Sequence, residues 1–300
     1  MTDTIPSIGR LVLIGIGLIG GSLARALKRV NAVEQVIGVA RSRGTGDLAL
    51  ELGVIDRFCM DPGEAVEDAS IVVIATPLRT FPNILDAIAK HLPNDATVTD
   101  VGSVKQYVIN AVKKHLPGHL ERFVPGHPIA GTERSGVHAS FAELFERRHV
   151  VLTPLAETTD AAVSLISDMW KRTGADVITM DGGYHDQILA TTSHLPHVIA
   201  YSLVRCLAEH PERDTLFEFA AGGFYDFTRI ASSDPVMWRD ICMTNRKPIL
   251  GALREFKSQL DDFIGAVEKE DGKLLQQYFA QAKQARDAGL NVKKKNANRG

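Results

Sequence analysis

The sequence predicts an α/β domain with a doubly wound parallel sheet, followed by an all-α domain. In the first 180 residues, short apolar runs alternate with segments of helical periodicity. This alternation of strands and helices is typical of a parallel sheet covered by helices on both faces. After residue 180 the strand pattern stops, and residues 184–287 have a helical pattern almost throughout. We therefore expect one domain over residues 1–181 and a helical domain over residues 182–300.

The composition is that of an ordinary globular protein. Of the 300 residues, 45% are hydrophobic and 23% are charged, which argues against disorder and against a coiled coil. The formal net charge is −2, so the chain lacks the basic character of a dedicated nucleic-acid binder. The uncharged run at 11–24 is too short to span a membrane. We expect neither nucleic acid nor a membrane as a partner.

The cysteines indicate the compartment. There are three of them, Cys59, Cys206 and Cys242, and they are too widely spaced to predict a disulfide framework or a metal cluster. Free thiols are typical of a reducing compartment, so we expect the cytoplasm.

The predicted strands are short and almost entirely apolar, as expected when both faces of a sheet are buried. They cover residues 11–14, 36–39, 71–75, 97–100, 123–124, 150–152 and 177–180. Helical periodicity is clearest at residues 22–30, 81–92 and 161–173.

The first strand runs directly into a glycine-rich turn. Its sequence fits G-x-G-x-x-G, follows a strand and opens a helix, which is the context that a dinucleotide-binding turn requires. The first glycine makes the tight turn, the second lets a pyrophosphate approach the backbone, and the third lets the helix pack against the strand. We therefore expect a Rossmann-like domain, with a glycine-rich turn that binds no ligand as the less favoured alternative. The predicted phosphate-binding residues are Gly15, Ile16, Gly17, Leu18, Ile19 and Gly20.

The end of the second strand bears on the choice of cofactor. NAD-selective sites usually carry an acidic residue about 20 residues after the glycine motif, and none stands there. Instead, Arg41, Ser42 and Arg43 offer charge-assisted hydrogen bonds to a 2′-phosphate, and Arg41 can stack on adenine. We expect NADP, with NAD as the second candidate. An ordinary basic loop is the structural alternative.

Ligands of open parallel sheets bind beyond the carboxyl ends of the strands. Thr76 and Pro77 follow the strand at 71–75, Ser103 follows the strand at 97–100, and His127 follows the strand at 123–124. We expect these segments to share one crevice, with Thr76 and Pro77 at the cofactor. Imidazole is suited to proton transfer near neutral pH, so His127 is predicted to be catalytic rather than a structural loop histidine.

The helical half adds a second polar set. At 100° per residue, Ser193 and His197 lie about 20° either side of Asp186, and His194 is about 80° away. Pro196 interrupts this helix. A metal site at His185, His194 and His197 is less favoured, because no cysteine joins them. A polar helix without a ligand is the other alternative.

Further along, Gly222 and Gly223 predict a break in the chain before Arg229, which suits an anion clamp. Ser233-Asp234-Pro235 predicts the start of the helix that carries Trp238. Apolar residues then recur at helical spacing over 249–267, either for core packing or for contact with a second subunit. Residues 291–300, with three lysines, are expected to form a solvated basic tail.

Four segments occur in an order that is more specific than the glycine motif. They are Thr99-Asp100-Val101-Gly102-Ser103-Val104-Lys105, Gly126-His127-Pro128-Ile129-Ala130-Gly131-Thr132-Glu133, His185-Asp186 with Ser193-His194-Leu195-Pro196-His197, and Asp226-Phe227-Thr228-Arg229-Ile230-Ala231. With them, residues 10–267 resemble the prephenate dehydrogenase family, which includes the arogenate and cyclohexadienyl dehydrogenases of tyrosine biosynthesis.

The resemblance implies an oxidative decarboxylation. Prephenate would pass a hydride from C4 to the nicotinamide, His127 would accept the proton of the C4 hydroxyl, and loss of carbon dioxide would give 4-hydroxyphenylpyruvate. Arogenate, which would give tyrosine, is the alternative substrate. Because arogenate-selective relatives tend to lose the equivalents of Glu133 and His197, the presence of both favours prephenate.

The resemblance also implies roles for individual residues. Ser103 would bond the C4 hydroxyl beside the nicotinamide, and Arg229 would bind the ring carboxylate. His197 and Thr132 would face the side chain of the substrate, with Ser193 and His194 on the same side. Glu133, Asp186 and Arg229 would form a charged network at the mouth of the pocket, and Trp238 an apolar wall. The helical domains of this family intertwine, so we expect an all-α dimerisation domain and a homodimer. We expect no chorismate mutase segment and no sizeable regulatory domain.

Two other functions remain open at this point. A β-hydroxyacid dehydrogenase would usually carry a lysine on the first long helix of its second domain, and residues 180–202 contain none. A non-catalytic dinucleotide sensor would need no set such as Ser103, His127 and Arg229.

Overall fold

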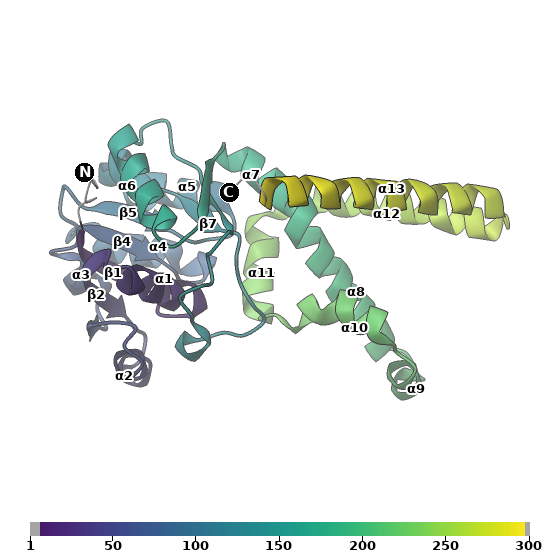
Figure 1. Cartoon of the computed structure of the whole chain (residues 1–300), viewed down its shortest axis with the longest axis horizontal. Helices are drawn as coiled ribbons and strands as arrows, with labels where there is room; N and C mark the ends of the chain where they lie inside the picture. Colours follow the sequence, from purple (N-terminus) through teal and green to yellow (C-terminus); the bar gives the residue numbers. More distant parts are fainter. Residues whose placement is uncertain (1–6, 298–300) are drawn as a thin grey trace. The chain divides into compact units, whose positions relative to one another are not determined.

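The structure is a computed structural model that describes residues 7–297, with side chains described as far as residue 291 (Figure 1). The chain forms two compact units, one ending at Arg246 and one beginning at Lys247. All the predicted site residues belong to the first unit.

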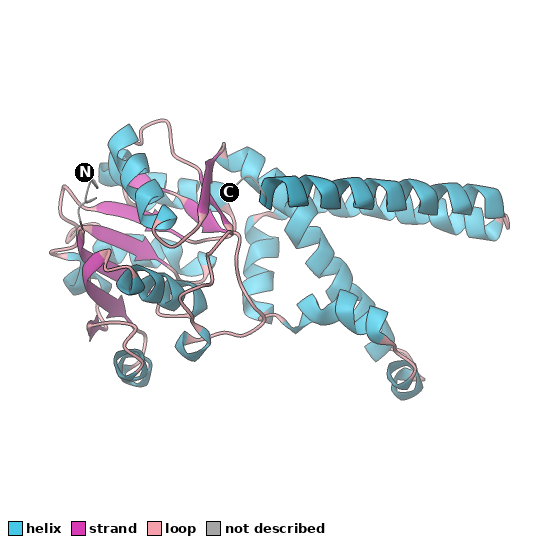
Figure 2. Ribbon diagram, viewed as in Figure 1, coloured by secondary structure: helices cyan, strands magenta, loops and turns pink. Residues whose placement is uncertain are grey.

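A six-stranded parallel sheet forms the centre of the first unit (Figure 2). Its strands are β1 (Ile8–Ile14), β2 (Val33–Val39), β3 (Arg57–Cys59), β4 (Ile71–Ile74), β5 (Thr97–Asp100) and β6 (Phe123–Val124). They lie in the order β3-β2-β1-β4-β5-β6, and each pair is parallel. The order reverses direction between β1 and β4, which is where doubly wound sheets bind ligands. The predicted α/β fold class is confirmed.

Helices connect these strands. They are α1 (Leu18–Arg29), α2 (Arg43–Glu51), α3 (Pro62–Val66), α4 (Phe81–Ile88), α5 (Lys105–His115) and α6 (Asp160–Lys171), with 3-10 turns at Leu78–Thr80, Pro117–Arg122 and Val137–Ala139. Each of the three helices predicted from periodicity is present.

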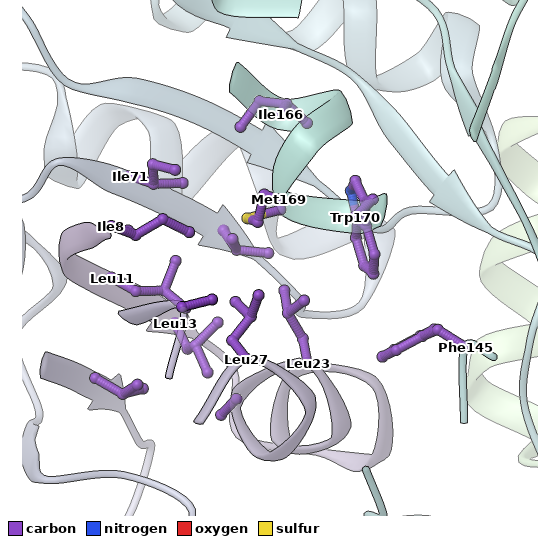
Figure 3. Packing of buried hydrophobic residues seen from close by; sticks show 14 of the residues in the cluster. Ile8, Leu11, Leu13, Leu23, Leu27, Ile71, Phe145, Ile166, Met169 and Trp170 are labelled. Atoms are coloured by element: carbon purple, nitrogen blue, oxygen red, sulfur yellow. The ribbon is translucent and has the colours of Figure 1, made fainter. Parts of the chain in front are cut away.

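A cluster of buried apolar residues lies between the sheet, α1 and α6 (Figure 3). Leu23 and Leu27 of α1 pack with Ile166 and Met169 of α6 against apolar strand residues such as Leu11. Alternate strand residues, such as Val12 and Val72, point to the opposite face and are also fully buried. This burial on both faces explains why residues 11–14 and 71–74 form unbroken apolar runs.

A second, smaller sheet corrects the expectation of one parallel sheet. It contains β7 (Gly126–Pro128), β8 (His149–Leu152) and β9 (Asp176–Thr179), and β7 is antiparallel to β8. The chain leaves the main sheet at Pro125, and Gly126 allows the new strand to approach β5. A Cβ at Gly126 would lie 2.9 Å from the carbonyl oxygen of Asp100. His127 therefore lies on a strand of its own, β7, and not in a loop that follows the strand at 123–124, as expected.

The rest of the first unit is helical. It comprises α7 (Gly182–Leu189), a π-helical segment (Ala190–His194), α8 (Leu195–Ala208), α9 (Arg213–Glu218), α10 (Gly222–Thr228), a 3-10 turn (Arg229–Ser232) and α11 (Pro235–Thr244). The predicted start of α11 is confirmed, because the Asp234 carboxylate accepts a hydrogen bond from the Met237 amide at 2.8 Å. The predicted break at Gly222 and Gly223 was wrong: these residues open α10, and Arg229 follows its last turn.

The second unit is a pair of long helices, α12 (Arg246–Glu268) and α13 (Gly272–Ala297). Phe263 of α12 contacts Tyr278 and Phe279 of α13, with ring centroids 5.2 and 5.5 Å apart. Residues 291–297, expected to form part of a basic tail, continue α13. Lysine and alanine are good helix formers. The side chains of Lys293, Lys294 and Lys295 and residues 298–300 lie outside the described residues. Among the described helices, none is both long and apolar enough to cross a membrane.

Candidate active site

The glycine-rich turn leaves one face of the backbone open. Gly15 has φ +104°, and a Cβ there would lie 2.5 Å from the carbonyl oxygen of Ala75. A Cβ at Gly20 would collide with the carbonyl oxygen of Gly15. A Cβ at Gly17, by contrast, would have nothing within 4 Å. No side chain caps α1 at Gly17, so its first amides remain available for an anion. This cradle fits the pyrophosphate of a dinucleotide.

The remaining predicted cofactor residues surround this turn. Ile16 is buried, and Leu18 and Ile19 pack partly against the core, so these three can meet a cofactor mainly through their backbone. Thr76 follows β4 next to Gly15, and its hydroxyl accepts a hydrogen bond from the Thr80 hydroxyl at 2.8 Å. Pro77 is exposed.

The basic segment after β2 opens α2. Ser42 is the N-cap of this helix, and its hydroxyl accepts from the Thr45 amide at 3.3 Å. Arg41 and Arg43 are exposed, and no ion pair joins either guanidinium to another residue of the described chain. The two arginines are thus available to a phosphate, while the Ser42 hydroxyl already caps its helix.

A buried ion pair links the ends of β5 and β7. Asp100 and Lys105 are both fully buried, and the Lys105 Nζ donates to Asp100 Oδ2 at 2.5 Å and to the carbonyl oxygen of Gly126. Asp100 also accepts from the Gly102 amide at 2.7 Å and from the Gly126 amide at 3.1 Å. Burial raises the pKa of Asp100 and lowers the pKa of Lys105, and their attraction opposes both shifts. This pair fixes the loop after β5 against the strand that carries His127.

Ser103 lies in the loop that is fixed in this way. The loop is held at Gly102 by Asp100, and at the Lys105 amide by Asp186 Oδ1 at 2.8 Å. Ser103 itself is partly buried. Its hydroxyl has no hydrogen-bond partner among the described side chains, so it is available to a ligand.

His127 is the first member of a chain of three polar side chains. Its Nδ1 lies 2.9 Å from Nε2 of His185, and Nδ1 of His185 lies 2.8 Å from Oδ1 of Asp186. His185 is fully buried and Asp186 is 2% exposed, whereas His127 is only partly buried. Burial is the main cause that lowers the pKa of His127 well below 6.5, and the neighbouring ionisable groups His185, Lys105 and His194 act in the same direction. His127 is therefore a neutral imidazole near pH 7.

Asp186 does not join the charged network that the sequence analysis expects, so that part of the prediction was wrong. Glu133 and Arg229 form an ion pair, and both side chains are exposed to solvent. Asp186 is instead buried at the start of α5, where its carboxylate accepts from the Lys105 amide at 2.8 Å and the Gln106 amide at 2.9 Å. These bonds supply the cap that Val104, at the N-cap position, cannot provide. Thr132 is exposed next to Glu133, and its hydroxyl accepts from the Arg134 amide at 3.2 Å.

The π-helical segment sets the directions of the remaining histidines. His194 is 1% exposed, and its Nδ1 lies 3.1 Å from the Asn245 amide nitrogen, which also donates to the carbonyl oxygen of Asp186 at 2.9 Å. His197 donates from Nδ1 to the carbonyl oxygen of Ser193 at 2.8 Å. Its ring stacks on Trp238 with centroids 3.8 Å apart. Because the π turn changes the helical phase, the face worked out at 100° per residue does not hold beyond residue 189.

Four residues without a predicted role are central to this geometry: Asp100, Lys105, His185 and Asn245. Asp100 and Lys105 flank Ser103 in one of the four specific segments, and His185 precedes Asp186, so a search for charged or titratable neighbours would have found them. Asn245 is distant in sequence and offers no such indication. Among the described residues, no group of three or more His, Cys, Asp or Glu is arranged to hold a metal ion.

Comparison with known proteins places the chain in a family. Residues 23–179 match the family model described as prephenate dehydrogenase, nucleotide-binding domain, and residues 181–281 match prephenate dehydrogenase, dimerization domain. The chain is 40% identical over 300 residues to a prephenate dehydrogenase of Bacillus subtilis, covering 99% of this chain and 78% of that protein. It is 38% identical over 278 residues to a cyclohexadienyl dehydrogenase of Zymomonas mobilis, covering 92% of this chain and 94% of that protein.

Solved structures give the same result. A prephenate dehydrogenase from Aquifex aeolicus, in complex with hydroxyphenyl propionate and NAD+, superimposes with a TM-score of 0.88 at 37% identity, over 94% of this chain and 98% of that one. An arogenate dehydrogenase from Synechocystis superimposes with a TM-score of 0.78 at 27% identity, over 93% and 99%. The chain belongs to the prephenate dehydrogenase family and is an oxidoreductase that uses a nicotinamide cofactor.

Proposed function

We propose that this chain catalyses the oxidative decarboxylation of prephenate to 4-hydroxyphenylpyruvate. The observation that carries the proposal is His127, a neutral imidazole on a strand that the Asp100–Lys105 pair fixes beside the Ser103 loop. A base held in this way, near a dinucleotide cradle, suits removal of a hydroxyl proton as the alcohol carbon is oxidised.

The nicotinamide cofactor, when bound at the glycine-rich turn, supplies the oxidising power for C4 of the substrate. The chain itself would handle the proton. The Ser103 hydroxyl would hydrogen-bond the C4 hydroxyl, and His127 would accept its proton as the carbonyl develops. Loss of carbon dioxide would then make the ring aromatic and leave its electron pair on the ring as a phenolate. Return of the proton from His127 to this oxygen would give the phenol of 4-hydroxyphenylpyruvate.

Charge and shape support a dianionic cyclohexadiene substrate. Arg229 offers an exposed guanidinium for a carboxylate, and binding would replace part of its pairing with Glu133. Thr132 and His197 would face the substrate side chain, with Ser193 and His194 behind them. Trp238, 8% exposed and stacked on His197, would be an apolar wall for the ring.

Arogenate is the second candidate substrate. It differs from prephenate in carrying an amino group in place of the side-chain keto group, and the Zymomonas and Synechocystis relatives are named for cyclohexadienyl and arogenate dehydrogenases. The presence of Glu133 and His197 favours prephenate, with use of both substrates as the alternative.

The direct test is a spectrophotometric assay of prephenate and arogenate with each cofactor, following reduced nicotinamide. Replacing His127→Asn should lower kcat by roughly 10²–10⁴ and leave KM nearly unchanged, because the base acts mainly in the transition state. The matched control is His91→Gln, at an exposed histidine on the chain's surface. Normal turnover in His127→Asn would exclude this histidine as the base.

For the cofactor we propose NADP. The support is the lack of an acidic residue at the end of β2 and the two exposed arginines, Arg41 and Arg43, beside the Ser42 cap. NAD is the competing candidate, because the Aquifex relative was solved with NAD+. The comparison is kcat/KM with NADP against NAD in the wild type and in Arg41→Ala/Arg43→Ala, with Lys90→Ala as an exposed control. Loss of the 2′-phosphate contacts should lower the NADP value selectively, and an NAD preference in the wild type would contradict the assignment.

We also propose that the chain acts as a homodimer through the segment that matches the family's dimerization domain. The three cysteines are free thiols, which supports a reducing compartment, and we propose the cytoplasm.

A further inference from the structure

The contact between His127 and His185 carries an inference that rests on the proposed role of His127. We propose that His185 is a positioning residue: with Asp186, it holds His127 in the tautomer protonated on Nδ1. Nε2 of His127 then keeps its lone pair and can accept the substrate proton.

The argument begins at Asp186. Its carboxylate accepts hydrogen bonds from the amides of Lys105 and Gln106, the first two residues of α5, at 2.8 and 2.9 Å. Both amides lie at the N-terminal end of the helix and donate to the Asp186 carboxylate. An ionised carboxylate can only accept hydrogen bonds. Nδ1 of His185, which lies 2.8 Å from Asp186 Oδ1, must therefore carry a proton.

The next step follows from the chemistry of a neutral imidazole. When one nitrogen carries the proton, the other is an acceptor. With the proton on Nδ1, Nε2 of the neutral His185 ring is the acceptor. Nδ1 of His127, 2.9 Å from that nitrogen, is then the donor. By the same rule, Nε2 of His127 is unprotonated.

The arrangement also serves the charged form of His127. When a hydroxyl proton moves to Nε2, the ring becomes an imidazolium that still donates through Nδ1 to His185. The charge then lies in line with Asp186, two hydrogen bonds away. The other ionisable groups facing His127 are Lys105, from α5, and His194, from the π-helical segment. Lys105 repels the protonated ring, whereas His194, with a pKa of about 4, carries no charge near pH 7. Asp186 thus offsets part of that repulsion.

The test reads the tautomer directly and does not depend on activity. Protein labelled with ¹⁵N-histidine is examined at pH 7.5 by long-range ¹H–¹⁵N correlation, and the His127 signals are identified by their absence in His127→Asn. We expect a protonated Nδ1 and an unprotonated Nε2 in the wild type. A His127 ring protonated on Nε2 would overturn the proposal, because His185 would then be the donor.

Two substitutions of His185 give a second readout. In His185→Phe, Nδ1 of His127 has no acceptor, and we expect signals of the Nε2-protonated tautomer and a kcat about 10- to 100-fold lower with KM little changed. In His185→Gln, the amide oxygen can still accept from Nδ1, so we expect the tautomer and most of the kcat to be retained. Equal kcat and the same tautomer in both variants would contradict a positioning role. If His185→Phe does not fold, the spectrum of the wild type still decides the proposal.

Failure of this inference differs from failure of the proposed function. If His127→Asn turns over normally, His127 is not the base, whatever its tautomer. If His127→Asn is inactive but the wild-type His127 ring is protonated on Nε2, His127 remains the proposed base. The positioning role of His185 is then excluded.

Discussion

At the scale of single residues, the site depends on imidazoles that burial keeps neutral. His194 illustrates this, because it is 1% exposed and is held by Asn245 rather than by solvent. Burial is the main cause that lowers its pKa to about 4, while the Asp186 carboxylate acts in the opposite direction. A group like this resists protonation only while the protein is folded, so its effect should appear as a dependence of stability on pH.

The sign of that dependence follows from which state binds more protons. Below pH 6.5 the unfolded His194 takes up a proton and the folded one does not, so unfolding becomes easier as the pH falls from 6.5 to about 4. At about 1.4 kcal/mol per pH unit, the loss attributable to this residue approaches about 3 kcal/mol. The lowered pKa of His127 acts in the same direction.

Urea unfolding at pH 7 and pH 4.5 measures this effect. Between pH 7 and pH 4.5 the free energy of unfolding should decrease less in His194→Gln than in the wild type. The reason is that glutamine does not titrate. Carboxylates titrate in both proteins, so only the difference between the two slopes is assigned to His194. Parallel slopes would show that the folded ring takes up its proton as readily as the unfolded one.

At the scale of secondary structure elements, the Asp100–Lys105 pair holds β5, the Ser103 loop and β7 together. Removing one member of a buried pair leaves an uncompensated charge, which typically costs about 3–5 kcal/mol. We therefore expect Lys105→Met to lower the free energy of unfolding by that amount. The control is Lys113→Met, which breaks an exposed pair with Glu157 and should cost at most about 1 kcal/mol.

Chemical denaturation followed by circular dichroism gives both values. The double variant Asp100→Asn/Lys105→Met should be more stable than Lys105→Met alone, because it no longer buries an unpaired carboxylate. A loss in Lys105→Met no larger than in Lys113→Met would mean that the buried pair contributes little to the folded state.

These elements also show what a single sequence can and cannot predict. Strands β1 and β4 were predictable because burial on both faces gives the apolar runs at residues 11–14 and 71–74. Strand β3 is short and begins with an exposed arginine, and β7 contains both glycine and proline, so neither has a strand pattern. The π-helical turn has no sequence pattern of its own, and it changes which residues share a face after Leu189.

Some parts of the candidate site could likewise be predicted from the sequence, and others could not. The glycine turn, Ser103 and His127 follow from their positions after strands, because parallel strands end at one edge of the sheet. Asp186 was expected in a charged network at the mouth of the pocket, but it caps α5 instead, and only the tertiary contact reveals that role. The sequence predicts β8 and β9 as strands but does not show which sheet they join. That depends on their pairing with distant segments of the chain.

At the scale of the whole molecule, the apolar stripe on α12 leaves large side chains in solvent. Phe256, Leu260, Ile264 and Val267 are between 37% and 62% exposed. These residues recur at three- and four-residue steps, so they form one face of the helix. An exposed apolar face of this kind marks an interaction surface, and it lies in the segment that matches the family's dimerization domain. We infer that a second copy of the chain covers it.

The substitution Leu260→Asp tests this assignment. In a twofold-symmetric dimer each substitution occurs twice, so two carboxylates would be buried in the interface. An unpaired buried charge costs several kcal/mol, and the dimer dissociation constant should rise at least about 100-fold. Ser258→Asp, at an exposed polar position about 160° around the same helix, is the matched control and should leave association unchanged. Sedimentation velocity over a dilution series measures both. A Leu260→Asp protein that remains dimeric at the dilution where the wild type begins to dissociate would place the contact between subunits on another face.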